Sequence, residues 1–159
     1  MDRKTIVLVA HDAKKLELLN WVEYNTPILK PHVLFATGTT GGLINRECPE
    51  LRVIPLRSGP LGGDQQVGAM IAENKVDLLI FFTDPMTTQP HDVDVKALTR
   101  LSVLYNLPMA CNRATADYII ASPLFFDAAY KREVPNYDCY TEREIDRIEE
   151  EDVKEPVPA

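Results

Sequence analysis

The chain has 159 residues, of which 45% are hydrophobic and 26% charged, and its formal net charge at pH 7 is −7. These values are typical of one globular domain and exclude disordered, collagen-like and low-complexity proteins, while the acidic balance argues against broad nucleic-acid binding. No apolar run is long enough to span a bilayer or to form a signal peptide. We therefore expect a cytoplasmic protein that binds neither membranes nor nucleic acid.

Short apolar runs rich in β-branched residues alternate with longer stretches of helical spacing. Strands are expected at 5–10, 32–36, 51–56, 76–82 and 108–111, and helices at 12–24, 39–47, 64–74, 93–105 and 114–121. The first run, TIVLVA, lacks polar alternation and so favours a strand buried on both faces. Because strands alternate with helices, we predict a three-layer α/β/α domain over residues 1–137, with a five-stranded, mainly parallel, flavodoxin-like sheet.

Residues 138–159 differ in composition from the rest of the chain. They hold nine acidic and three basic residues, whereas the remainder holds 15 acidic and 14 basic residues and is nearly neutral. Thr141 and Glu144 have the spacing of a capping box for a short helix, and the two prolines at the end predict fraying. We expect an acidic, partly helical segment with a frayed end, outside a domain body able to hold a local anion site.

The cysteines and histidines indicate neither disulfides nor a metal centre. Cys48, Cys111 and Cys139 lie far apart, and no Cys-x-x-Cys occurs. An odd number of separated cysteines without an export signal predicts free thiols in a reducing compartment. Only three histidines are present, and none has ligand-like spacing to another histidine or cysteine. We expect no metal and no cofactor.

Polar or glycine-rich residues follow every predicted strand. They lie at 11–12, 37–42, 58–66, 83–84 and 112–115. In open α/β sheets ligands bind beyond the carboxyl ends of the strands, so these clusters are expected at one edge of the sheet. All seven glycines fall between positions 38 and 68, mostly in the second and third of these junctions. Glycine allows backbone to approach a ligand closely.

The second and third junctions have the character of a phosphate cradle. Thr39 and Thr40 would open a helix whose first N–H groups favour an anion, and Lys15 adds a cation. Neither the Gly-x-x-x-x-Gly-Lys-[Ser/Thr] loop nor the Gly-x-Gly-x-x-Gly fingerprint is present. The structural alternative is a tight turn followed by a helix cap.

Carboxylates and histidines beside such a cradle suit proton abstraction next to a carbonyl. The carboxylate takes the proton while an imidazole polarises the carbonyl oxygen. Each side chain also has a structural interpretation: Asp12 and Asp64 as helix caps, Asp84 as a turn residue and His11 as a packed histidine. His91 and Asp94 belong to the loop that follows Asp84, whose length is typical of functional or mobile loops.

Six segments, in chain order, resemble methylglyoxal synthases. They are AHD at 10–12, ATGTTG at 36–41, SGPLGGDQQVG at 58–68, FFTDP at 81–85, PHDVDVKAL at 90–98 and NRATAD at 112–117. The resemblance runs from about residue 6 to residue 123 and leaves the acidic end unexplained. It implies the parallel α/β fold, conversion of dihydroxyacetone phosphate to methylglyoxal and inorganic phosphate without a metal, a homohexamer, and inhibition by inorganic phosphate.

The resemblance also implies roles for individual residues. Asp64 would remove a proton from the hydroxymethyl carbon, and His91 would face the carbonyl and enediolate oxygens. Asp94 and Asp84 would be supporting carboxylates, and His11 would line the substrate site. The positions that match phosphate-binding residues are Lys15, Thr37, Gly38, Thr39, Thr40, Ser58 and Gly59.

Two other functions compete with a lyase. A regulatory module of the same fold could keep the cradle without performing acid–base chemistry, although Asp64, His91 and Asp94 are all present here. A phospho-acceptor receiver domain would need acidic residues after the first and third strands and a lysine after the fifth. His11-Asp12, Ser58-Gly59 and Asn112-Arg113 occupy those places, so the receiver fits poorly.

Overall fold

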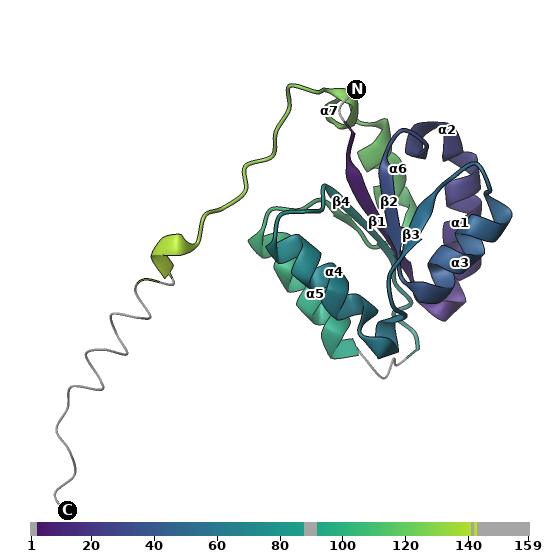
Figure 1. Ribbon diagram of the computed structural model, residues 1–159, viewed down its shortest axis with the longest axis horizontal. Helices are drawn as coiled ribbons and strands as arrows, with labels where there is room; N and C mark the ends of the chain where they lie inside the picture. The colour runs from purple at the N-terminus through teal and green to yellow at the C-terminus, as the bar shows by residue number, and fades with distance from the viewer. Residues whose placement is uncertain (1–2, 88–91, 141, 143–159) are drawn as a thin grey trace, which may run out of the picture.

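A five-stranded parallel sheet with helices on both faces forms the body of the protein (Figure 1). The computed structural model describes residues 3–87, 92–140 and 142. The strands are β1 (Thr5–Ala10), β2 (Val33–Ala36), β3 (Val53–Pro55), β4 (Leu78–Phe82) and β5 (Met109–Ala110). The helices are α1 (Lys15–Tyr24), α2 (Thr26–Leu29), α3 (Gly38–Glu47), α4 (Gly63–Ala72), α5 (Asp92–Leu104), α6 (Arg113–Ala121) and α7 (Pro123–Phe126), with 3-10 turns η1 (Asp12–Lys14) and η2 (Gly59–Leu61).

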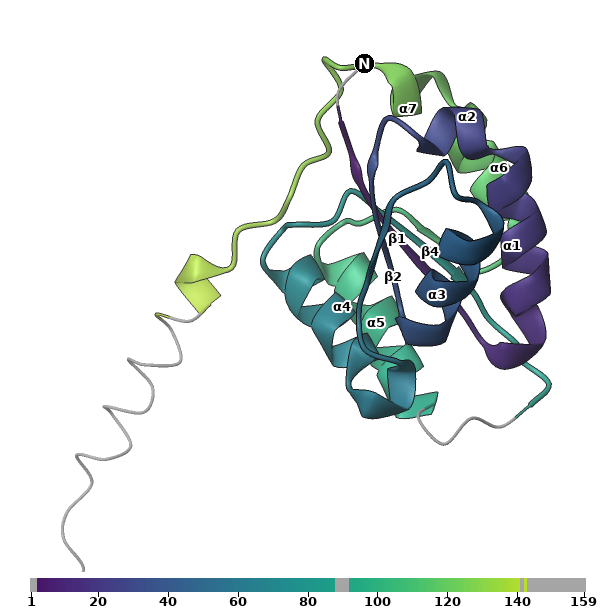
Figure 2. The same ribbon diagram turned by 45° about the vertical axis from the view of Figure 1, so that its right-hand side comes forward.

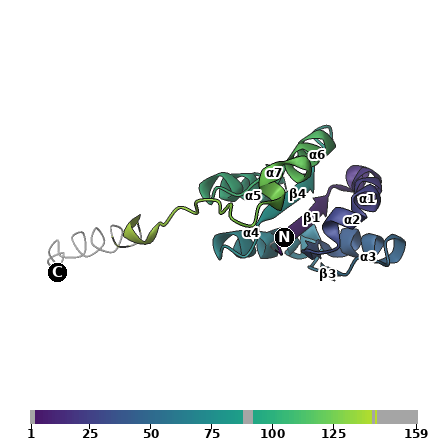
Figure 3. The same cartoon turned by 90° about the horizontal axis from the view of Figure 1, so that it is seen from above.

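Side chains of β1 alternate between two hydrophobic cores, which explains its unbroken apolar sequence. Ile6, Leu8 and Ala10 join the core beneath α1, α2, α3, α6 and α7, whereas Val7 and Val9 join the core beneath α4 and α5. Figures 1 and 3 show α4 and α5 together on one side of the sheet and α1 and α3 on the other. Full burial of a Val, Leu or Ile side chain is worth about 1.5–3 kcal/mol, so both layers contribute to stability.

The predicted class, with three layers and five strands, is confirmed, but the strand order departs from the flavodoxin type. The order is β3-β2-β1-β4-β5, and Val7 of β1 lies opposite both Phe35 of β2 and Leu79 of β4. The flavodoxin order 2-1-3-4-5 instead places the third strand between the first and fourth. Here β3 is an edge strand, which agrees with its exposure beyond Val53.

Asn45 of α3 holds this edge strand in place. Its side chain donates to the Val53 carbonyl at 2.9 Å and accepts from the Val53 N–H at 3.0 Å. Because the chain then passes from β3 through α4 to β4, it moves from one side of β1 to the other. The change of direction creates a crevice at the carboxyl ends of the central strands.

Two short helices were not predicted, and both begin at proline-containing turns. Pro27 lies in the first turn of α2, and Pro123 opens α7 behind Ser122, whose hydroxyl accepts from the Leu124 N–H at 3.2 Å. Proline is tolerated at a helix start because its missing N–H has no helical partner there. Figure 2 shows α7 beside the N-terminus, at the amino end of the sheet. The predicted capping box of Thr141 and Glu144 lies outside the described residues.

Candidate functional site

A cavity of about 330 Å³ opens at the carboxyl ends of β1, β2 and β3 and beside the start of α4. It brings together eight residues that the sequence predicted for the site: His11, Lys15, Thr37, Thr39, Thr40, Ser58, Gly59 and Asp64. Gly38 neighbours this set, Asp84 and Asp94 are not among the residues that line the cavity, and His91 lies outside the described residues. Val9, Ala10 and Phe81 add an apolar floor that the sequence analysis did not assign to the site.

Two glycines allow the second and third junctions to press against each other. A Cβ on Gly38 would lie 2.8 Å from the Ser58 backbone nitrogen, and one on Gly63 would lie 2.0 Å from the Arg57 carbonyl oxygen. Gly62 has a φ of 96°, in the left-handed region that favours glycine. These close approaches explain why glycines concentrate in this part of the chain and bring the Thr39 and Ser58 loops to one cavity.

The start of α3 supplies hydrogen-bond donors. Thr37 is the N-cap residue, and its side chain makes no capping bond to the helix. The N–H groups of Thr39 and Thr40 lie in the first turn, where an α-helix offers them no carbonyl partner. The Thr40 hydroxyl is buried and has no hydrogen-bond partner within the described part of the chain. A buried hydroxyl without a partner is costly, so a ligand that accepts its hydrogen bond gains affinity.

Gly38 contributes to this cradle because the absence of a side chain allows close packing. Its own N–H donates to the Arg57 carbonyl at 3.1 Å. That bond joins the two junctions and occupies the Gly38 N–H, whereas the first-turn amides of Thr39 and Thr40 have no helical carbonyl partner. The predicted role of Gly38 in phosphate binding stays a prediction, with close packing as its structural basis.

Lys15 reaches the cradle from the first turn of α1. Its ammonium donates to Thr39 Oγ1 at 2.7 Å and to Asp12 Oδ1 at 2.5 Å. The Asp12 side chain is largely exposed, so water screens this ion pair and its net worth is small. A phosphate in the cradle would therefore compete with one exposed carboxylate for the lysine.

His11 is buried at the end of β1 and oriented by two neighbours. Its Nδ1 accepts from the Asp84 backbone N–H at 2.8 Å, and its ring packs edge-to-face on Phe81 with centroids 5.0 Å apart. In the neutral ring the acceptor role of Nδ1 assigns the proton to Nε2. Asp84 thus positions His11 through its backbone.

The Asp84 side chain is engaged by its own loop. Its carboxylate accepts from the Met86 N–H at 3.0 Å. Hydrogen bonds from Thr87 first, and then from Met86, lower the pKa of Asp84 below its usual range. The group is therefore stabilised as a carboxylate that holds the loop after β4. A supporting role for this carboxylate stays a prediction, and loop positioning is the contribution that its contacts support.

Asp64 is the buried carboxylate of the site. It lies in the first turn of α4, lines the cavity and is only 3% exposed. Asp94, in the first turn of α5, accepts from the Gln65 amide at 2.8 Å. The sequence predicts no role for Gln65, yet this hydrogen bond joins α4, which carries Asp64, to α5. The place of Gln65 in the sequence, directly after Asp64, is the feature that could have indicated a role in the site.

The described residues contain no cluster of three or more histidines, cysteines or carboxylates that could hold a metal ion. Cys48, Cys111 and Cys139 are free thiols. No helix within the described ranges is both long and apolar enough to cross a bilayer. Within the described residues, the cavity lining offers two carboxylates, an imidazole, an ammonium, hydroxyls and backbone amides.

Comparisons with known proteins identify the family of this chain. Residues 17–111 match the model of the MGS-like domain family. A methylglyoxal synthase from Oleidesulfovibrio alaskensis is 53% identical over 141 residues, which cover 89% of this chain and 95% of that protein. One from Leptospira interrogans is 56% identical over 141 residues, covering 89% and 94%.

A solved structure extends the similarity to three dimensions. The crystal structure of methylglyoxal synthase from Elizabethkingia anophelis is 50% identical, with a TM-score of 0.80, and the match covers 98% of this chain and 93% of that one. The resemblance seen in the six motifs is thereby confirmed over nearly the whole chain. With half or more of its residues shared across most of its length, this chain belongs to the methylglyoxal synthase family.

Proposed function

We propose that this protein is a carbon–oxygen lyase that converts dihydroxyacetone phosphate to methylglyoxal and inorganic phosphate. The observation that carries the proposal is the meeting of a buried carboxylate, Asp64, with an anion cradle formed by Lys15 and the start of α3, in one cavity of about 330 Å³. A cavity of this size accommodates a small triose ester. The family membership of the chain supports the same activity.

In the first step Asp64 removes a proton from the hydroxymethyl carbon of the bound substrate. The electron pair of the broken C–H bond moves to the carbonyl and yields an enediolate. Its negative charge needs nearby donors, a role that we assign to His91 and His11. Proton transfer of this kind is typically worth about 10²–10⁴-fold in rate, and stabilisation of the oxyanion adds to that.

In the second step the enediolate collapses and expels phosphate. The C–O bond to the phosphate breaks, its electron pair leaves with the phosphate, and the departing phosphate takes up the equivalent of the proton that Asp64 removed. The remaining enol tautomerises to methylglyoxal. Expulsion requires the breaking C–O bond to align with the π system of the enediolate. We infer that the cradle holds the phosphate out of the enediolate plane, and a bound substrate analogue with an in-plane phosphate would contradict this.

The cradle supplies binding energy and recognises the product as well as the substrate. The amides of Thr39 and Thr40, the hydroxyls of Thr37 and Ser58, and the Lys15 ammonium are all suited to a dianionic phosphate. Inorganic phosphate fits the same groups, so we propose it as an inhibitor. We also propose a homohexamer as the assembly. The free thiols support the cytoplasm as its compartment.

Turnover by the purified protein tests the function directly. The full chain is incubated with dihydroxyacetone phosphate in the presence of a chelator, and free phosphate and methylglyoxal are followed in parallel. We expect the two products in equal amounts. Substrate binding without either product would overturn the lyase and favour a regulatory module with the same cradle.

A further inference from the structure

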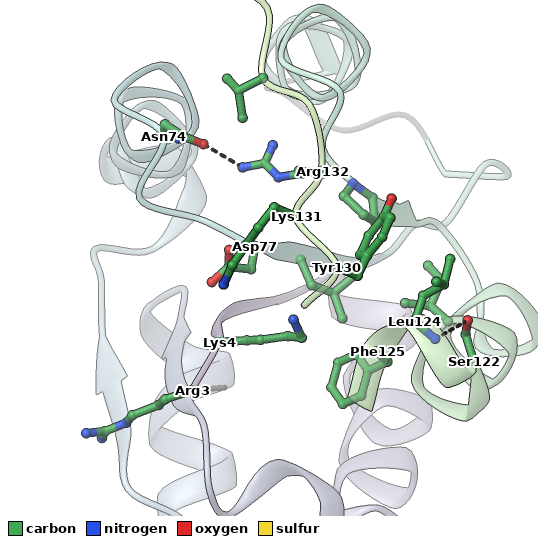
Figure 4. Close-up of a pocket in the computed structure, with 14 residues that line it drawn as sticks. Arg3, Lys4, Asn74, Asp77, Ser122, Leu124, Phe125, Tyr130, Lys131 and Arg132 are labelled. Carbon is green, nitrogen blue, oxygen red and sulfur yellow. Dashed lines mark hydrogen bonds between the residues drawn. The ribbon is translucent and has the colours of Figure 1, made fainter. Parts of the chain in front are cut away.

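A second cavity, of about 510 Å³, lies at the amino end of the sheet (Figure 4). Lys4, which precedes β1, Leu78, which opens β4, and Pro108, which precedes β5, line it. The chain after α7 folds back over these strand ends and closes the cavity with residues 130–132 and 134. The cavity is therefore at the opposite end of the strands from Asp64 and shares no lining residue with the first one.

The lining of this cavity is strongly basic. Among the described residues that form it, Arg3, Lys4, Lys131 and Arg132 are cationic, and Asp77 is the one carboxylate. This is an excess of three positive charges in a chain whose net charge is −7. Positive charge gathered in a concave site on an acidic protein concentrates anions there.

Two of these charged residues, Arg132 and Asp77, are hydrogen-bonded within the wall of the cavity. The Arg132 guanidinium donates to the carbonyls of Tyr105 and Val76 at 2.9 and 2.7 Å. It also donates to the Asn74 side chain at 2.7 Å (Figure 4). The Asp77 carboxylate accepts from the Thr5 N–H at 2.8 Å. These bonds fix the covering segment against the body, so the cavity is a formed part of the fold.

Arg3, Lys4 and Lys131 supply the other positive charges of the lining, and of these Lys4 lies beside an aromatic surface. Phe125 and Tyr130 line the cavity, and the Lys4 ammonium lies 5.8 Å from the centre of the Phe125 ring. Buried His32 packs edge-to-face on Phe125, with centroids 5.3 Å apart. Burial lowers the pKa of His32, the charges of Lys4 and Arg3 lower it further, and the charge of Asp77 opposes them.

We propose that this cavity binds a small organic anion that combines a planar ring with a phosphate or carboxylate group. The ring would pack on Phe125 and Tyr130, and the anionic group would meet Lys4 and Lys131, with Arg3 adding positive charge nearby. The volume lies within the range of about 300–1,000 Å³ typical of small-molecule sites. Charge-assisted hydrogen bonds from several cations favour such an anion over a neutral ring of the same size.

Pyridoxal phosphate is a suitable probe because it carries a planar ring, a phosphate and an aldehyde that forms an imine with a neighbouring lysine. The full-length protein is treated with it, reduced with borohydride and mapped by peptide mass spectrometry. We expect Lys4 and Lys131 to react roughly tenfold faster than the exposed Lys96 on α5. A tenfold difference corresponds to about one hydrogen bond between a cationic side chain and the phosphate of the probe. The rate at which Lys15 is labelled reports on binding of the probe in the first cavity.

Competition and substitution separate the parts of the proposal. Phenyl phosphate should protect Lys4 and Lys131, whereas pyridoxal, which lacks the phosphate, should label them about as slowly as Lys96. Arg3→Ala removes a cation without removing a labelled lysine, so it should slow both reactions. Arg46→Ala, an exposed arginine on α3, is the matched control and should leave them unchanged.

Three results would overturn the proposal. Lys4 and Lys131 could react no faster than Lys96, or Arg3→Ala could slow labelling no more than Arg46→Ala. Inorganic phosphate could also protect these lysines as well as phenyl phosphate does, which would show that the cavity does not recognise a ring. Because labelling needs no turnover, none of these results bears on the proposed lyase.

Discussion

The two cavities of this protein both present positive charge, but they present it in different ways. At the carboxyl end, first-turn amides, hydroxyls and one lysine surround a buried carboxylate, Asp64. At the amino end, four cationic side chains and the rings of Phe125 and Tyr130 line the cavity, and the carboxylate there, Asp77, accepts from the Thr5 backbone N–H. Rigid donors beside an acid–base group suit chemistry, whereas side-chain cations around an apolar wall suit binding alone.

The largest effect that this comparison predicts is at Asp64. Asp64→Asn keeps the shape of the side chain and removes its ability to take a proton, so turnover should fall by about 10²–10⁴-fold or more. Binding of inorganic phosphate, measured by calorimetry, should survive. A variant that retains turnover would rule out Asp64 as the base and remove the chemical distinction between the cavities.

The next effect concerns the close approach at Gly38. In Gly38→Ala the new Cβ would lie 2.8 Å from the Ser58 nitrogen, so the two loops must part. We expect a loss of about 1–3 kcal/mol in unfolding free energy and a raised KM. Gly42→Ala is the matched control, because nothing lies within 4 Å of its Cβ and it should stabilise α3 by about 0.5–1 kcal/mol. Denaturant unfolding and steady-state kinetics distinguish the two variants.

Removing the cation of the cradle should affect binding more than chemistry. Lys15→Ala loses a charge-assisted contact to the phosphate, so KM and the inhibition constant of phosphate should each rise by roughly tenfold or more. Lys14→Ala, which removes a neighbouring lysine paired with Glu17, is the control. An unchanged apparent affinity in Lys15→Ala would count against its assignment to the phosphate.

Arg132 provides the corresponding test at the amino end. Arg132→Ala removes three hydrogen bonds that hold the covering segment, and the unfolding free energy should fall by about 1–3 kcal/mol. Turnover of the folded protein should be unchanged. Arg132→Lys should restore little of the stability, because one ammonium cannot reproduce the planar fork. A loss of turnover in either variant would show that the two ends of the sheet are coupled.

The smallest predicted effect is a pH dependence from His32. Its pKa is lowered in the folded state, so the unfolded chain binds the proton more readily. Stability from neutral, buried His32 is present above the ordinary histidine pKa of about 6.5 and declines as the pH falls below it. His32→Gln keeps an acceptor for the Lys4 N–H and should flatten the melting temperature between neutral and mildly acidic pH. An equally steep profile in the variant would exclude this source.

Local sequence patterns were sufficient for the five strands and for the longer helices α1, α3, α4, α5 and α6. The run TIVLVA matches β1 to the residue, and the helical spacings at 39–47 and 64–74 agree with α3 and α4 to within one or two residues at each end. These elements could be predicted because apolar periodicity and glycine-rich junctions act over a few neighbouring residues. The same patterns did not place β3 at the edge, since strand order depends on contacts such as Asn45 with Val53.

Most residues of the carboxyl-end site were predictable for a related reason. In a parallel sheet every strand delivers its following residues to the same edge, so His11, Thr39 and Asp64 converge by topology. Residues that act across helices were not predictable: Gln65 contacts Asp94 only because α4 and α5 lie side by side. The supporting role that the resemblance implies for the Asp84 carboxylate stays a prediction, and the contact of its backbone N–H with His11 could not be foreseen from the sequence.

The order of residues along the chain was enough to establish an α/β protein and to predict that its anion-binding residues and a carboxylate lie at one edge of a parallel sheet. The cavity at the other edge arises from long-range packing, because Arg3 and Lys4 meet Tyr130 and Arg132 only when the end of the body folds back over the strand beginnings. No local periodicity encodes that meeting of residues more than a hundred positions apart. Three side-chain hydrogen bonds from Arg132 hold it in place.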